Sequence, residues 1–115
     1  MKTLHLISAY VLIALGTGHT LLTPIFYPGF SADALWFAGT GLALLFLGLL
    51  NIAAQQNPIT ILLNLCVIAN LMGLVFLALV TFAVPEFQAF VALLAAFDLV
   101  VSALAFRKST LAAIS

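Results

Sequence analysis

Residues 59–82 read ITILLNLCVIANLMGLVFLALVTF, a continuous apolar stretch without a single Asp, Glu, Lys or Arg. A helix needs about 20 such residues to cross the hydrocarbon core of a bilayer. Three more stretches have the same character, and they occupy residues 4–22, 32–54 and 87–106. We therefore predict a single domain, residues 1–115, that is an all-α integral membrane four-helix bundle with antiparallel, up-down-up-down helices.

The composition excludes most other classes of protein. Of the 115 residues, 66% are hydrophobic and 5% are charged, and the mean hydropathy is +1.37. Soluble domains carry about 25% charged residues, so this chain could not cover a water-facing surface. Disorder is excluded as well, because it requires low hydrophobicity and high charge. Lys and Arg total three, too few to follow a phosphate backbone, so we expect the lipid bilayer and no nucleic acid as a partner.

The cysteine and histidine content limits the chemistry further. The single cysteine, Cys66, rules out an intrachain disulfide, a CxxC redox pair and a cysteine-based zinc site. We expect it to be a small packing residue. His5 and His19 lie fourteen residues apart, about 21 Å along a helix, which is too far to share a metal. We predict no metal, no cofactor and no catalytic residue, since His19 with Glu86 alone is a thin basis for an enzyme.

Local signals mark the ends of the stretches. Thr23 and Pro24 are expected to close the first helix, because proline disfavours helix in the residue before it. Ser31 is a plausible N-cap for the second stretch, and Pro58 suits the first position of the third helix, with Asn57 as its cap. The first stretch could also be a signal peptide, but its length favours a spanning helix.

The few charges predict the topology. Lys2, Arg107 and Lys108 lie at the two ends of the chain, whereas Asp33 and Glu86 lie in the first and third connections. With an even number of helices both ends share one side, and the positive-inside rule places them in the cytoplasm.

One acid falls within an apolar stretch. Asp98 lies nine residues before Arg107, about 13 Å into the membrane, where a carboxyl group is costly and faces protein or water. Ser102 shares its helix face, and Asn70 and Tyr10 are expected at a similar depth. These residues are candidates for a proton-coupling or ligand site. The alternative is a neutral acid that hydrogen-bonds the helices together.

A second polar cluster is expected at the outer face, and aromatic residues accompany it. A histidine with a carboxylate at a membrane mouth could bind a polar headgroup or relay protons, or it could simply be hydrogen-bonded at the interface. The candidates are His19, Thr40, Glu86 and Gln88. Tyr27 lies within the aromatic connection 23–31 and Trp36 follows it, so the two can form an aromatic belt at the interface. The connection itself forms either a lid over an outward cavity or an anchor at the interface.

Small residues on the second stretch predict close helix packing. Gly41 and Gly48 lie seven residues apart and would let another backbone approach, as small residues do in lipid. A homodimer is a reasonable extension of this pattern.

The chain resembles known families of small membrane proteins in part. Its size and one mid-membrane acid are similar to the small multidrug resistance transporters, but those carry their glutamate in the first helix, where this chain has no acid. The run GHTLLTPIFYPGFSADALWFAGTG, residues 18–41, resembles DoxX-like four-helix bacterial membrane proteins. That resemblance implies a bacterial inner membrane and little settled chemistry.

Two functions remain open at this stage. The first is binding or transport of a small hydrophobic or cationic molecule, with Asp98 as the mid-membrane charge site. The second is a structural or accessory protein that associates with a partner or with lipid through its small-residue helix faces.

Overall fold

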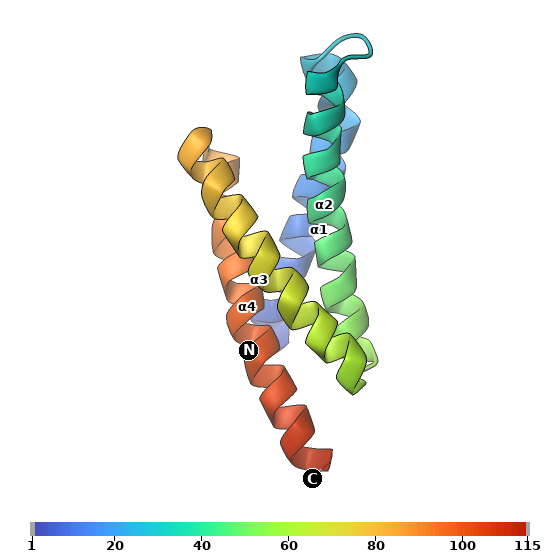
Figure 1. Ribbon diagram of the computed structural model, residues 1–115, viewed down its shortest axis with the longest axis vertical. Helices are drawn as coiled ribbons and strands as arrows, with labels where there is room; N and C mark the ends of the chain where they lie inside the picture. The colour runs from blue at the N-terminus through green and yellow to red at the C-terminus, as the bar shows by residue number, and fades with distance from the viewer. Residues whose placement is uncertain (1, 115) are drawn as a thin grey trace.

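The computed structural model describes residues 2–114, so the predicted domain extends one residue beyond this range at either end. The described chain forms four helices and measures 54 × 23 × 21 Å. All four helices are long and apolar enough to cross a membrane. They are α1 (Lys2–Phe26), α2 (Ala32–Gln56), α3 (Thr60–Ala83) and α4 (Phe87–Ile114) (Figure 1). The predicted all-α four-helix bundle is confirmed, and the chain is a multi-pass membrane protein.

The bundle consists of two helical hairpins that form a wedge. Helix α1 packs along α2, and α3 packs along α4, while contact between the hairpins is made chiefly by α1 with α4. Figure 1 shows the hairpins spreading apart toward the end that carries the 27–31 connection and approaching each other in the other half. Helices α2 and α3 touch much less than the other neighbouring pairs, although the short turn between them predicts close neighbours.

Glycines allow α1 and α2 to pack backbone against backbone. A methyl group added at Gly16 would lie 2.6 Å from the backbone nitrogen of Leu45, and one at Gly48 would lie 2.7 Å from the carbonyl oxygen of Ala9. Both distances are too short for a real side chain. The small-residue face of α2 is therefore already occupied by α1 of the same chain.

Helices α1 and α4 extend furthest beyond their predicted ends. Helix α1 continues through Pro24 to Phe26, because a proline this close to the end removes one backbone N–H and leaves the earlier turns intact. The hydroxyl of Thr23 donates to the carbonyl oxygen of His19 at 3.0 Å and supports this last turn. Helix α4 runs to Ile114 instead of residue 106, because the residues after Arg107 are compatible with helix and need no membrane around them.

The helix caps match the prediction for α2 but not for α3. The Ser31 hydroxyl accepts a hydrogen bond from the backbone N–H of Ala34 at 3.2 Å. Helix α3 begins two residues later than expected, at Thr60, and its N-cap Ile59 makes no side-chain cap bond. Asn57 instead ends α2, where its N–H donates to the carbonyl oxygen of Ala53.

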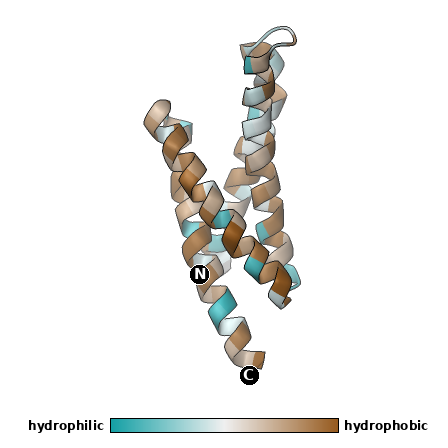
Figure 2. Cartoon of the chain, viewed as in Figure 1, coloured by the Kyte–Doolittle hydropathy of each residue, from teal (hydrophilic) through white to brown (hydrophobic). Residues whose placement is uncertain are grey.

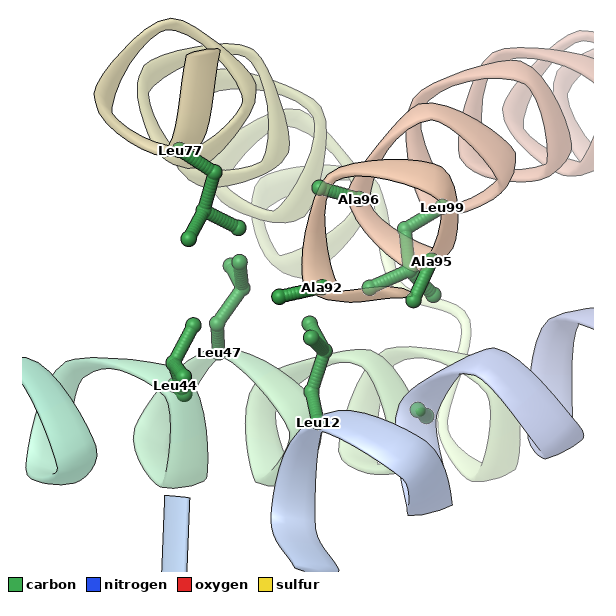
Figure 3. Close-up of a cluster of buried hydrophobic side chains, with 9 residues drawn as sticks. Leu12, Leu44, Leu47, Leu77, Ala92, Ala95, Ala96 and Leu99 are labelled. Atoms are coloured by element: carbon green, nitrogen blue, oxygen red, sulfur yellow. The ribbon is translucent and has the colours of Figure 1, made fainter. Parts of the chain in front are cut away.

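The core is small and lies where the hairpins meet. Leu12 of α1 and Leu47 of α2 point toward Leu77 and Ala92 of the other hairpin (Figure 3). Leu12 and Leu99 are fully buried. Apolar residues cover most of each helix (Figure 2), and many large ones, such as Phe82 at 90% exposure, point outward, as lipid-facing side chains should.

Candidate functional site

A cleft of about 430 Å³ opens between the two hairpins at their spread end. All four helices and the connection after α1 contribute to its walls, and Leu44, Leu77 and Ala92 line it where it meets the core. The polar and aromatic lining residues are His19, Tyr27, Asp33, Trp36, Phe37, Thr40, Glu86 and Gln88. The lining therefore combines apolar side chains with a limited set of polar ones.

Aromatic rings gather around Phe37 on the α1–α2 side of this cleft. The imidazole of His19 stacks on the ring of Phe37, with centroids 3.6 Å apart and planes at 19°. The Tyr27 ring is centred 5.0 Å from the same phenylalanine. The hydroxyl of Thr40 donates to the carbonyl oxygen of Trp36 at 3.0 Å, so it is satisfied within its own helix. These contacts fix several ring faces beside the cleft.

The charge in the cleft lining is negative. Asp33 of α2 and Glu86, just before α4, line opposite hairpins. Gln88 donates to the Glu86 carboxylate, and His19 interacts electrostatically with the same group. Among the described residues, none of those that line the cleft is Lys or Arg. Two carboxylates near a low-dielectric wall attract a cation more strongly than they would in open water.

The structure brings the outer candidates to one place. His19, Thr40, Glu86, Gln88, Tyr27 and Trp36 all line the cleft. Their roles as ligand-binding or lid residues stay predictions.

Asp98 lies elsewhere, half-buried in a polar cluster between α1 and α4. The hydroxyl of Ser8 donates to its Oδ2 at 2.6 Å, and the hydroxyl of Ser102 lies 3.2 Å from Oδ1. The imidazole of His5, only 5% exposed, lies near enough to interact electrostatically with the carboxyl group. Ser102 thus belongs with Asp98 as predicted from the helix face, while Asn70 and Tyr10 do not contact it.

Tyr10 was expected at the depth of Asp98 as a candidate for the same site, but its side chain points away from Asp98. Its side chain is 57% exposed on the outer surface of α1. Successive helical residues turn by about 100°, so Ser8 and Tyr10 point about 200° apart and only one of them can face α4. In the structure it is Ser8 that faces α4, although its depth in the membrane differs little from that of Tyr10.

Asn70 pairs with Asn51 and not with Asp98. The two side-chain amides exchange hydrogen bonds, from Asn51 Nδ2 to Asn70 Oδ1 at 2.6 Å and from Asn70 Nδ2 to Asn51 Oδ1 at 2.8 Å. Cys66 Sγ donates to Asn51 Oδ1 at 3.2 Å, and Asn70 Nδ2 also donates to the carbonyl oxygen of Leu99 at 3.2 Å. Both asparagines are fully buried, so this pair joins α2, α3 and α4 at the centre of the contact between the hairpins.

Sequence reasoning missed His5, Ser8 and Asn51 as buried polar residues. A signal for the first two is present, because positions 5, 8 and 12 recur on one face of α1 and place two polar residues in line with the buried Leu12. Asn51 lies near the end of its predicted stretch, a position that suggests the headgroup region. The approach of the two hairpins at this level buries it instead.

Comparison of the chain with known proteins identifies no relatives. No family model, no curated protein and no solved structure matches the chain. In the described part of the chain, no three His, Cys, Asp or Glu side chains gather as a metal-binding group.

Proposed function

We propose that the protein binds a small hydrophobic cation in the cleft between its two hairpins. The observation that carries this proposal is the combination of aromatic rings and two carboxylates around an apolar cavity, without a Lys or Arg among the described residues that line it. The electron-rich faces of aromatic rings attract cations, by about 0.5–2 kcal/mol each. Glu86 and Asp33 supply the opposite charge.

The size of the cleft supports a ligand of small-molecule dimensions. Ligand sites in proteins commonly enclose roughly 300–1,000 Å³, with mainly apolar walls and a few polar groups. At about 430 Å³ the cleft falls within this range. Leu44, Leu77 and Ala92 would contact the hydrophobic part of the ligand, and the residues around Phe37 would contact its charged part.

The charge site of this proposal is Glu86 with Asp33, and not Asp98. Asp98 follows Ala92, which lines the cleft, by six residues along α4, a rise of about 9 Å. Its hydrogen bonds go to Ser8 and Ser102. A ligand in the cleft would therefore not reach the Asp98 carboxyl group.

Orientation and location belong to the proposal as well. Arg107 and Lys108 at one end of α4 support cytoplasmic termini by the positive-inside rule, while the side chain of Lys2 lies outside the described residues. The cleft would then open outward. The resemblance of residues 18–41 to DoxX-like proteins supports the inner membrane of a bacterium. Transport of the ligand would require a second arrangement that opens the other half of the bundle.

The accessory alternative loses its main support. It relied on Gly41 and Gly48 as a free surface for a partner or a second copy, but both glycines pack against α1 of the same chain. A homodimer through this face would require the α1–α2 hairpin to come apart.

Binding can be measured through Trp36, the single tryptophan of the chain, which lines the cleft. The protein in nanodiscs is titrated with tetraphenylphosphonium, and the quenching of tryptophan fluorescence is followed, with empty nanodiscs as the partition control. Tetraphenylborate has nearly the same shape and the opposite charge, so it tests charge recognition directly. We expect saturable quenching by the cation and at least about tenfold weaker binding of the anion, the factor that corresponds to 1.4 kcal/mol.

Two variants locate the site within the chain. Glu86→Gln should weaken binding of the cation about fivefold, because an exposed charge contact such as that of Glu86 is worth about 1 kcal/mol. Asp98→Asn is the matched control and should leave the affinity unchanged. Equal affinities for the cation and the anion, or a larger loss in Asp98→Asn than in Glu86→Gln, would refute the proposal.

A further inference from the structure

A titratable pair lies where α1 meets α4, with His5 buried and Asp98 half-buried. His5 is 95% buried, and its Nδ1 atom has no hydrogen-bond partner in the structure. Ser8, one turn later on the same helix face, donates to Asp98 Oδ2 at 2.6 Å. The His5 imidazole therefore lies about one helical turn from the hydrogen bond that joins Ser8 of α1 to the Asp98 carboxyl group.

The other elements around this pair contribute neutral groups. Ser102 of α4 donates to Asp98 Oδ1, and the backbone carbonyl of Asn51 on α2 interacts with the His5 ring. Helix α3 brings the thiol of Cys66, which donates to Asn51. Arg107 lies nine residues further along α4 and bonds to Asn64 Oδ1 at 2.6 Å. Among the side chains that the structure describes, no Lys or Arg lies beside Asp98.

An ionised carboxylate without a counter-charge is costly at this depth. Insertion scales put an Asp at the centre of a spanning helix at about 2.5–3.5 kcal/mol, and such groups are paired or neutralised when they are buried. Binding of one proton makes the His5–Asp98 pair neutral overall, because the proton can reside either on the Asp98 carboxyl group or on the His5 imidazole.

From this geometry we infer that His5 and Asp98 together form a proton-binding site that couples proton uptake to the contact between α1 and α4. With the proton bound, the pair is neutral and the contact through Ser8 persists. Loss of the proton leaves a net negative charge on the half-buried Asp98 between two packed helices, and separation of the helices would let more water hydrate it. The Asn51–Asn70 amide pair does not titrate, so it holds the hairpins together independently of pH.

This site is separate from the cleft and does not depend on the proposed cation ligand. The bundle would then respond at two places. A ligand binds in the cleft at the spread end, and a proton binds at His5 and Asp98 in the half where the hairpins contact each other. If the protein transports its ligand, release of this proton would weaken the contact between α1 and α4 and so allow the half of the bundle away from the cleft to open.

The experiment measures the distance between α1 and α4 in nanodiscs as a function of pH. Spin labels are placed at Ile7 and Val101, which are 53% and 42% exposed, in a Cys66→Ser background that retains a hydrogen-bond donor. Pulsed electron–electron double resonance then gives the distance from about pH 3 to about pH 10, a range that spans the ordinary pKa values of carboxyl groups and imidazoles. We expect a reversible increase of roughly 2 Å or more as the pH rises, the scale of helix shifts in switching proteins.

Three variants test the assignment. The Asn side chain in Asp98→Asn cannot ionise, so this variant should keep the short distance between the labels on α1 and α4 at every pH. His19→Gln removes the other histidine and should leave the transition unchanged. His5→Gln should move the transition by at least about one pH unit, a tenfold change in proton affinity.

A distance that is independent of pH in the otherwise unmodified protein, or the same transition in Asp98→Asn, would overturn the inference. If Asp98→Asn does not fold, an unmoved transition in His5→Gln overturns it equally. The binding of tetraphenylphosphonium to Asp98→Asn is expected to persist, so a failure of this inference can be told from a failure of the cleft proposal.

Discussion

The Asn51–Asn70 pair makes a quantitative prediction about how the hairpins are held together. Replacement of Asn70 by Leu, which has a similar size, removes the two reciprocal amide bonds and the bond to the carbonyl oxygen of Leu99. Hydrogen bonds between membrane helices contribute about 0.6 kcal/mol each on average. Three such bonds predict a loss of about 2 kcal/mol in the free energy of unfolding.

A double-mutant cycle separates the pair from its surroundings. Asn51→Leu removes the same two reciprocal bonds as Asn70→Leu, so the double variant loses them only once. We therefore expect the double variant to be about 1 kcal/mol more stable than the sum of the two single changes predicts. Asn64→Leu combined with Asn51→Leu is the control, because Asn64 bonds to Arg107 and shares no partner with Asn51.

The assay is reversible unfolding in mixed detergent micelles, followed by circular dichroism, for the full cycle of variants. Independent sites usually add within about 0.3–0.5 kcal/mol, which is the expected result for the control combination. If the Asn51 and Asn70 changes are additive within the same limits, the amide pair does not stabilise the contact as argued, and the packing of the surrounding leucines must do so alone.

Three further predictions use the same unfolding assay. Gly16→Ala should destabilise the protein by about 1–3 kcal/mol, because its methyl group would overlap the backbone of α2, whereas Gly39→Ala, which has open space, should be neutral or slightly stabilising. Equal effects at the two glycines would contradict the close packing of α1 on α2. Ser31→Ala should cost about 1 kcal/mol through loss of the N-cap bond of α2, and no loss would mean that this cap is unimportant in the membrane. Tyr10→Leu should change stability by less than about 0.5 kcal/mol, because the ring faces outward; a large loss would indicate a contact on that surface.

The sequence predicts the helices well because lipid imposes a single strong requirement on length and hydrophobicity. Residues 59–82 were expected as a helix, and α3 spans Thr60–Ala83. The ends are less predictable, since Pro24 near a terminus costs one bond and does not stop α1. Arg107 likewise marks the membrane edge but not the helix end.

The partners of buried polar residues could not be predicted from depth alone. Depth places Asn70, Tyr10 and Asp98 at similar levels, but the direction of each side chain depends on which helices touch. Tyr10 faces outward, and Asn70 faces Asn51 because the hairpins approach at that level. By contrast, the outer candidates all lie at one end of the bundle. His19 and Glu86 therefore both line the cleft, and depth alone was enough to predict that they would lie near each other.

The open cleft follows from the absence of a hydrophobic force between helices in lipid. Lipid tails solvate apolar side chains as well as a neighbouring helix does, so polar bonds and close packing decide where helices meet. The contacting half of this bundle has those bonds, at Asn51–Asn70 and Ser8–Asp98. At the cleft the hairpins spread apart, and among the described residues no side-chain hydrogen bond joins one hairpin to the other there.

This argument predicts that a second amide pair would close the cleft. Leu44 lies seven residues before Asn51 and Leu77 seven residues after Asn70, so each occupies nearly the same helix face as its asparagine, two turns closer to the spread end. Both line the cleft. The double variant Leu44→Asn/Leu77→Asn should form a second pair between the hairpins and lower the affinity for tetraphenylphosphonium at least about tenfold.

The single variants separate closure from simple loss of an apolar contact. Each removes one leucine from the cleft wall and leaves an amide without its partner, so each should be less stable than the double variant by about 1 kcal/mol. If the double variant is no more stable than the single ones, or binds the cation as tightly as the unmodified protein, then polar bonding does not set the opening of the wedge. In that case the spread of the hairpins must come from the shape of the side chains that line the cleft, among them Trp36 and the stacked pair of Phe37 and His19.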